Sequence, residues 1–108
     1  MTAAISIYPR VGQYMGVSRD TKVGNFRVIL YAALNAFGMI GSEFNGIAVL
    51  DEKNKSIVCD GIAKESSGYS GPSNAQISVW ESLAKMAEDK PNAFIAFLND
   101  QPGCRAPL

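Results

Sequence analysis

The chain has 108 residues, and its ten basic and ten acidic side chains leave no formal net charge. This length fits a single compact domain, residues 1–108, and a neutral chain has no overall field that would draw it to nucleic acid or to a membrane. Histidine is absent from the sequence, which excludes the commonest general base, the usual metal ligand and the ordinary pH switch near neutrality.

The N-terminal part predicts one short strand followed by irregular chain. Residues 3–8 show the alternation and β-branching of a strand, and Pro9 ends that strand or confines it to a sheet edge. Residues 11–17 predict a loop or an irregular second strand, and residues 18–25 predict a connecting loop.

Residues 26–40 (FRVILYAALNAFGMI) form the most apolar stretch of the chain. Its alanines favour a long helix over about residues 26–39, with Asn25 as the N-cap. A strand over residues 26–31 is the competing interpretation, because Phe, Val, Ile and Tyr suit a pleated surface. The stretch is too short and too interrupted to span a bilayer, which takes about 20 apolar residues.

A helix that is apolar on nearly every side must be covered on nearly every side. Either the sheet and the last two helices cover it completely, or a second copy of the chain does. The second alternative predicts a homodimer whose interface contains Ile29, Ala33, Leu34 and Phe37.

The clearest local signal is a β-hairpin over about residues 46–62. Two apolar runs flank a turn at residues 52–54, and strict alternation places Ile57 and Cys59 on one face and Val58 on the other. Asp60 interrupts the apolar pattern. It either needs a buried partner, such as Arg27 or Lys64, or protects an exposed sheet edge.

Two amphipathic helices are predicted at the C-terminal end. Ser73 and Gln76 form a capping-box pattern that begins a helix over about residues 74–87. A shorter helix over about residues 90–100 follows, capped by Asp89, and the chain from about residue 103 is expected to be a loose tail.

These elements together predict an α+β fold. A small antiparallel sheet with a central hairpin (46–62) packs against the long helix (26–39) and the two C-terminal helices (74–87 and 90–100).

Few residues suit catalysis or metal binding. Serines are plentiful, but no histidine is present to activate one. Cys59 and Cys104 are far apart and form no CxxC motif, so the sequence predicts two free thiols in a reducing cytoplasm and neither a zinc site nor a redox motif. We therefore expect no catalytic residue, no metal and no cofactor.

The loop over residues 66–73 (SSGYSGPS) is the stretch that looks most like a binding site. Its glycines and hydroxyls lead to a helix N-terminus, where backbone amides can bind an anion. The candidate ligand-binding residues are Ser67, Tyr69, Ser70, Asn74 and Trp80. The loop matches neither GxxxxGK[ST] nor GxGxxG, and a flexible strand-to-helix connection has the same composition.

The sequence favours a small, non-enzymatic accessory protein that self-associates and binds a protein partner. The alternative is a sensor domain that binds an anion or a metabolite through residues 66–73. A hydrolase or lyase that works without histidine is the third hypothesis.

Overall fold

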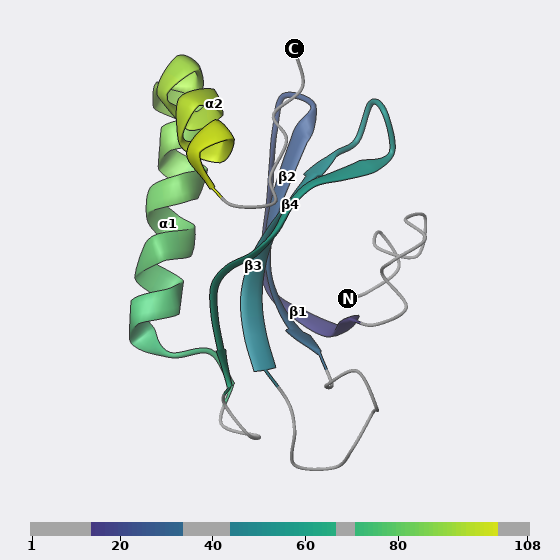
Figure 1. Cartoon of the computed structure of the whole chain (residues 1–108), viewed down its shortest axis with the longest axis vertical. Coiled ribbons are helices and arrows are strands. Elements are labelled where there is room, and N and C mark those ends of the chain that lie inside the picture. The colour runs from purple at the N-terminus through teal and green to yellow at the C-terminus, as the bar shows by residue number, and fades with distance from the viewer. Residues whose placement is uncertain (1–13, 34–43, 67–70, 102–108) are drawn as a thin grey trace.

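The computed structural model describes residues 14–33, 44–66 and 71–101. Its elements, in order, are β1 Tyr14–Val23, β2 Phe26–Ala33, β3 Phe44–Asp51, β4 Ser56–Ser66, α1 Asn74–Asp89 and α2 Pro91–Asp100. The strands form one antiparallel sheet in the order β1-β2-β3-β4. Both helices lie against the same face of this sheet (Figure 1). The predicted α+β class is confirmed.

The predicted helix over residues 26–39 is wrong in its first half. Phe26–Ala33 is β2, a central strand that pairs with β1 on one side and β3 on the other. Val28 and Leu30 belong to one core cluster and Ile29 and Tyr31 to another. A strand covered on both faces is apolar at every position, so its sequence resembles that of a buried helix. Residues 34–39 lie outside the described ranges.

The loop predicted over residues 18–25 is also wrong. Most of it belongs to β1, and a two-residue turn, Gly24–Asn25, joins β1 to β2. Gly24 has a φ of +58° and Asn25 does not have a positive φ, as expected for a type II′ turn that suits the twist of a hairpin. The strand predicted over residues 3–8 lies outside the described ranges.

β3 and β4 pair at the predicted position, but the details of the hairpin differ. It is not central, because β4 is an edge strand of the described sheet. Three register shifts interrupt its ladder, and such bulges bend and twist the strand that carries the extra residues. Val58 and Cys59 therefore both join the main core, whereas Ile57 packs on the opposite face. The strict alternation predicted for these residues is wrong.

Both C-terminal helices occur where the sequence predicts them. The capping box is confirmed, because Ser73 Oγ accepts from Gln76 N at 3.1 Å and Gln76 Oε1 accepts from Ser73 N at 3.0 Å. Asp89 does not cap the second helix as expected, since it is the last residue of α1. The N-cap of α2 is Lys90, and Pro91 occupies the first turn, where its missing N–H costs nothing.

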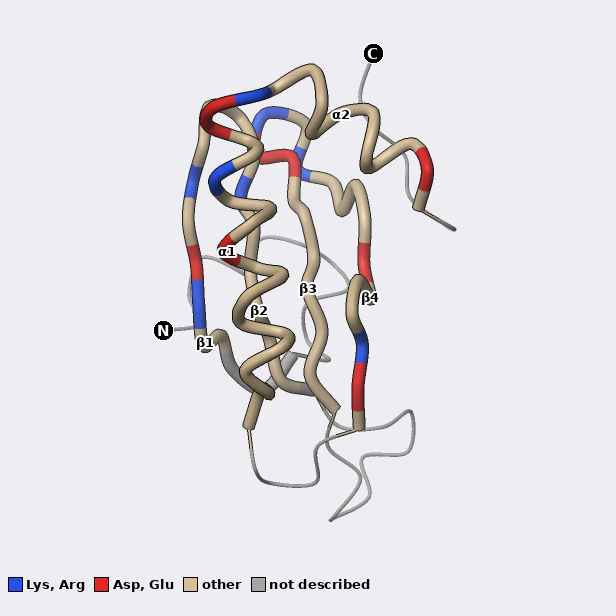
Figure 2. The backbone as a smooth tube through the Cα atoms, turned by 90° about the vertical axis from the view of Figure 1, so that its left-hand side faces the viewer, with Lys and Arg blue, Asp and Glu red and all other residues tan. Residues whose placement is uncertain are grey.

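The core has one cluster on each face of the sheet. The main core lies under the helices, where Leu83, Ala87, Phe94 and Leu98 meet the strands. The second cluster, on the opposite face, contains Ile29, Tyr31, Ala48 and Leu50, each at most 2 % exposed. Figure 2 shows charged residues along β1, β4 and the turns, and none in the middle of β2 and β3.

Candidate functional site

The predicted loop site is not assembled within the described residues. Ser67, Tyr69 and Ser70 lie outside the described ranges, and Asn74 is an exposed residue at the start of α1. Trp80 has a packing role, because its Nε1 donates to the carbonyl oxygen of Val28 at 3.0 Å and its ring packs on the main core. No described pocket is lined by Trp80.

Gln76 connects α1 to the sheet. Its side chain is 1 % exposed, and its Nε2 donates to the carbonyl oxygens of Asn45 at 3.0 Å and of Ala63 at 2.9 Å. With the capping bond to Ser73 N, both ends of the amide have partners. The capping-box pattern identified this residue, but its two bonds to the sheet come from a long-range contact that the pattern does not encode.

The predicted interface residues do not form a surface within the described part of the chain. Ile29 is fully buried in the second cluster. Ala33 is the last residue of β2, and Leu34 and Phe37 lie outside the described ranges.

A concavity lies at one end of the sheet, which we call the turn end because it carries the β1–β2 and β3–β4 turns. Its volume is about 350 Å³, and Ala87 of α1 and Pro91 of α2 contribute to its lining. We call it the turn-end pocket; it is lined by Val23, Gly24, Asn25, Phe26, Asp51, Lys53, Asn54, Ala87 and Pro91.

Asp51 organises the β3–β4 turn beside this pocket. It is 3 % exposed, and its Oδ1 accepts from the backbone N–H groups of Lys53 at 3.0 Å and Asn54 at 3.1 Å. Its Oδ2 accepts from Asn54 Nδ2 at 2.8 Å. Both carboxylate oxygens therefore accept hydrogen bonds from residues of the turn, and Asp51 stabilises this wall of the pocket.

A backbone hydrogen bond joins the two turns. The N–H of Glu52 donates to the carbonyl oxygen of Asn25 at 2.8 Å. The walls contributed by the two hairpins are thereby joined through the backbone.

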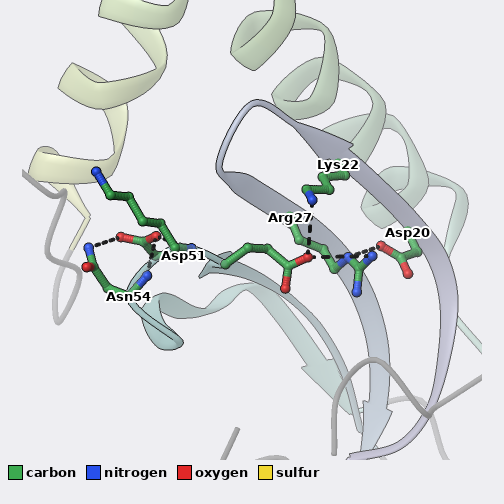
Figure 3. A network of polar contacts seen from close by, with 7 residues as sticks. Asp20, Lys22, Arg27, Asp51 and Asn54 are labelled. Atoms are coloured by element: carbon green, nitrogen blue, oxygen red, sulfur yellow. Dashed lines mark hydrogen bonds and ion pairs between the residues drawn. The ribbon is translucent and has the colours of Figure 1, made fainter. Parts of the chain in front are cut away.

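Charged side chains form a network at the same end, on β1, β2 and the β3–β4 turn (Figure 3). Arg27 is central, with its Nε 3.2 Å from Asp20 Oδ1 and its Nη2 3.7 Å from Glu52 Oε1. The Nε contact is an ion pair without hydrogen-bond geometry. Lys22 approaches Glu52 at 3.9 Å. Glu52 thus connects the two hairpins through its side chain as well as its backbone.

The opposite end of the sheet carries a second polar group. The Tyr31 hydroxyl donates to Asp60 Oδ1 at 2.6 Å, a contact that the sequence does not predict. Lys64 places its Nζ 4.3 Å from the centre of the Phe44 ring. No pocket found in the described residues opens at this group, and we assign it to stability.

The turn-end pocket combines apolar and polar lining residues. Val23, Phe26, Ala87 and Pro91 provide the apolar side, and Lys53 is the one basic side chain among the lining residues. The described residues contain no group of three or more Cys, Asp and Glu side chains that could hold a metal ion. Such a pocket can hold an apolar body and attract an acidic group.

Sequence reasoning missed this pocket. The turn at residues 52–54 is a local signal in the sequence, but the pocket arises only because both turns and the α1–α2 corner meet in space. The residue pattern of one segment does not indicate which distant segments it will contact.

The chain matches no family model, no curated protein and no solved structure. Among the described helices, none combines the length and apolar character needed to cross a bilayer.

Proposed function

We propose that this domain binds a small molecule with an apolar body and an acidic group in the turn-end pocket, and that it does so without catalysing a reaction. The observation that carries the proposal is the pocket itself, whose lining contains four apolar side chains and one basic side chain, that of Lys53. Its volume of about 350 Å³ lies at the lower end of the range for ligand sites, which is roughly 300–1,000 Å³.

Lys53 supports an acidic group on the ligand. It is exposed, and within the described part of the chain it has no ion-pair partner. The one carboxylate that lines the pocket, Asp51, accepts hydrogen bonds from three N–H groups of its own turn. Asp51 is therefore poorly placed to bind a cationic ligand or to act as a base.

This proposal replaces self-association as the leading function. The face expected to associate includes Ile29, which is buried within a single chain, and the second cluster around it is equally buried. Partner binding through residues 26–39 stays a prediction, and its test is described in the Discussion.

The experiment uses 8-anilinonaphthalene-1-sulfonate, a dye with apolar rings and one sulfonate whose fluorescence rises in apolar sites. The wild-type chain, K53E and K55E are titrated with the dye. Both lysines are exposed residues of the same turn, but only Lys53 lines the pocket, so K55E controls for the change in net charge.

We expect K53E to weaken dye binding by about fivefold or more. The attraction between the Lys53 side chain and the sulfonate of the dye becomes a repulsion between two negative charges at short range. K55E should bind as the wild type does. Equal affinity of all three proteins, or equal losses in both variants, would overturn the proposal. Circular dichroism identifies a variant that binds the dye because it is partly unfolded.

A further inference from the structure

β1 is one edge of the described sheet, because no described strand pairs on its far side. Its ladder with β2 is irregular between Tyr14 and Gly16 and between Val17 and Arg19, and is continuous from Arg19 to Val23. Figure 2 shows β1 at the left-hand margin of the sheet. A continuous edge presents backbone groups to which another strand can bind.

The two-residue turn determines which backbone groups of β1 point outward. Val23 and Phe26 close the hairpin, and the closing pair of such a turn is hydrogen-bonded. Because the pairs of an antiparallel ladder alternate, Val23 and Thr21 direct their N–H and C=O groups toward β2. Asp20 and Lys22, which are both exposed residues, direct theirs away from the described sheet.

We infer that the chain forms a symmetric dimer in which β1 pairs antiparallel with β1 of a second copy, with Thr21 on the two-fold axis. This register places Asp20 opposite the partner's Lys22, and Lys22 opposite the partner's Asp20. Each of these two pairs exchanges two backbone hydrogen bonds. The four described strands of each copy become parts of one continuous sheet. The inference does not depend on the proposed function, and its interface is not the one predicted over residues 26–39.

The charges of β1 select this register. Opposite charges on directly opposed residues stabilise an antiparallel pair, and like charges destabilise it. A two-fold axis through a sheet keeps every residue on its own face, so the register can change only in steps of two residues. One such step opposes Asp20 to the partner's Asp20, and the step in the other direction opposes Lys22 to the partner's Lys22. Both neighbouring registers therefore place like charges together.

Contacts within one chain hold the two side chains in place. Asp20 lies opposite Ile29 of β2, whose side chain belongs to the second cluster, so Asp20 and Lys22 are on the face of the sheet away from the helices. Asp20 Oδ1 is 3.2 Å from Arg27 Nε, and Lys22 Nζ is 3.9 Å from Glu52 Oε1 (Figure 3). In the dimer, Lys22 of each chain lies between Glu52 of its own chain and the partner's Asp20.

The other edge strand, β4, is less suited to such pairing. Three register shifts interrupt its ladder with β3, and Gly61 and Ala63 have positive φ angles of 80° and 54°. Bulges of this kind bend an edge strand and prevent regular pairing. β4 is also constrained by Cys59, which is disulfide-bonded and is not the free thiol predicted from the sequence. β1 is therefore the edge of the described sheet that a second copy fits.

The first test measures the mass of the wild-type chain by sedimentation velocity. An interface made of one strand pair is small, and small interfaces are weak. We expect a monomer at about 1 µM and a dimer at about 1 mM. A monomer at every concentration would overturn the inference.

Hydrogen exchange on the wild-type chain identifies the edge that pairs. The amides of Asp20 and Lys22 should exchange about fivefold more slowly in the concentrated sample, the factor expected when roughly four fifths of the chains are paired. The amides of Thr21 and Val23 are already bonded to β2 and should change less. A dimer in which the amides of Asp20 and Lys22 exchange as fast as in the monomer would place the interface elsewhere and overturn the inference.

Charge reversal tests the register. D20K places a lysine opposite the partner's Lys22, and K22D places an aspartate opposite the partner's Asp20. Each variant alone should therefore dimerise about tenfold more weakly than the wild type. A mixture of D20K and K22D restores opposite charges at both positions, so the mixed dimer should form about as strongly as the wild-type dimer.

K85D and D89K are the matched controls, because they make the same changes of charge at exposed positions of α1. Both should dimerise as the wild type does. The inference fails if D20K and K22D each dimerise as strongly as the wild type, or if their mixture dimerises no more strongly than each alone. Circular dichroism shows whether each variant is folded, and the exchange measurement decides the question if D20K or K22D is not.

Discussion

The Tyr31 hydroxyl reaches Asp60 across an intervening strand, at a distance of 2.6 Å. Tyr31 is on β2 and Asp60 is on β4, and Gly46 of β3 is the direct neighbour of Tyr31 in the ladder. A Cβ added at Gly46 would lie 2.9 Å from the Tyr31 hydroxyl and 3.1 Å from its Cζ. Gly46 therefore provides the space in which the tyrosine ring crosses the sheet.

Gly46→Ala should destabilise the fold by about 1–3 kcal/mol, because the new methyl group overlaps a tyrosine that is 2 % exposed and must shift to make room for it. Urea denaturation followed by circular dichroism measures this cost.

The same substitution in a Tyr31→Leu background provides the control. Leucine removes the ring atoms that the methyl group would meet, so Gly46→Ala should cost less there than in the wild type. An equal cost in both backgrounds would show that the loss arises from the backbone at residue 46 and not from the ring.

Gln76→Glu should destabilise the chain more than Ser73→Ala. The glutamate can keep the capping bond to Ser73 N, but it places an oxygen where Nε2 now donates to the carbonyl oxygens of Asn45 and Ala63. We expect a loss of about 2–4 kcal/mol for Gln76→Glu and about 1 kcal/mol for Ser73→Ala.

Chemical denaturation at neutral pH measures both variants. If Ser73→Ala costs as much as Gln76→Glu, then Gln76 acts mainly as a cap and its bonds to the sheet contribute little.

Lys55→Gly should stabilise the protein or leave its stability unchanged. Lys55 has a φ of +54° at the end of the β3–β4 turn, a conformation that costs a non-glycine residue about 1–2 kcal/mol. Glycine removes this strain, although its greater freedom in the unfolded chain offsets about 0.4–1 kcal/mol of the gain.

Lys53→Gly is the matched control, because Lys53 is an exposed lysine of the same turn without a positive φ. It should lose stability in thermal denaturation while Lys55→Gly does not. Equal losses in the two variants would contradict the assigned strain.

The sequence predicted the elements whose signals are local. α1 has a capping box and an amphipathic pattern, and α2 has Pro91 in its first turn, so both were found within a few residues of their observed ends. The sequence of β2 resembles that of a helix because a strand buried on both faces lacks the alternation that identifies a strand.

The remaining errors come from contacts between distant residues. The bulges of β4 moved Val58 and Cys59 onto one face, and a bulge is decided by pairing and not by the composition of one strand. The turn-end pocket needs two turns and a helix corner to meet. The hydroxyl that donates to Asp60 belongs to Tyr31, 29 residues earlier in the chain, and no local pattern encodes a contact over that separation.

Ile29→Asp tests whether this residue is core or interface. A charge placed at a fully buried position has no water and no partner, and we expect a loss of about 3–5 kcal/mol or complete unfolding. Ser82→Asp, on the exposed side of α1, should fold normally and controls for the added charge.

Light scattering behind size exclusion, at several concentrations, gives the mass of the wild type and of both variants. A wild-type dimer that Ile29→Asp converts into a folded monomer would restore the self-association predicted from the sequence. An unfolded Ile29→Asp variant, beside a folded Ser82→Asp variant, would assign Ile29 to the core and leave the turn-end pocket as the better-supported site.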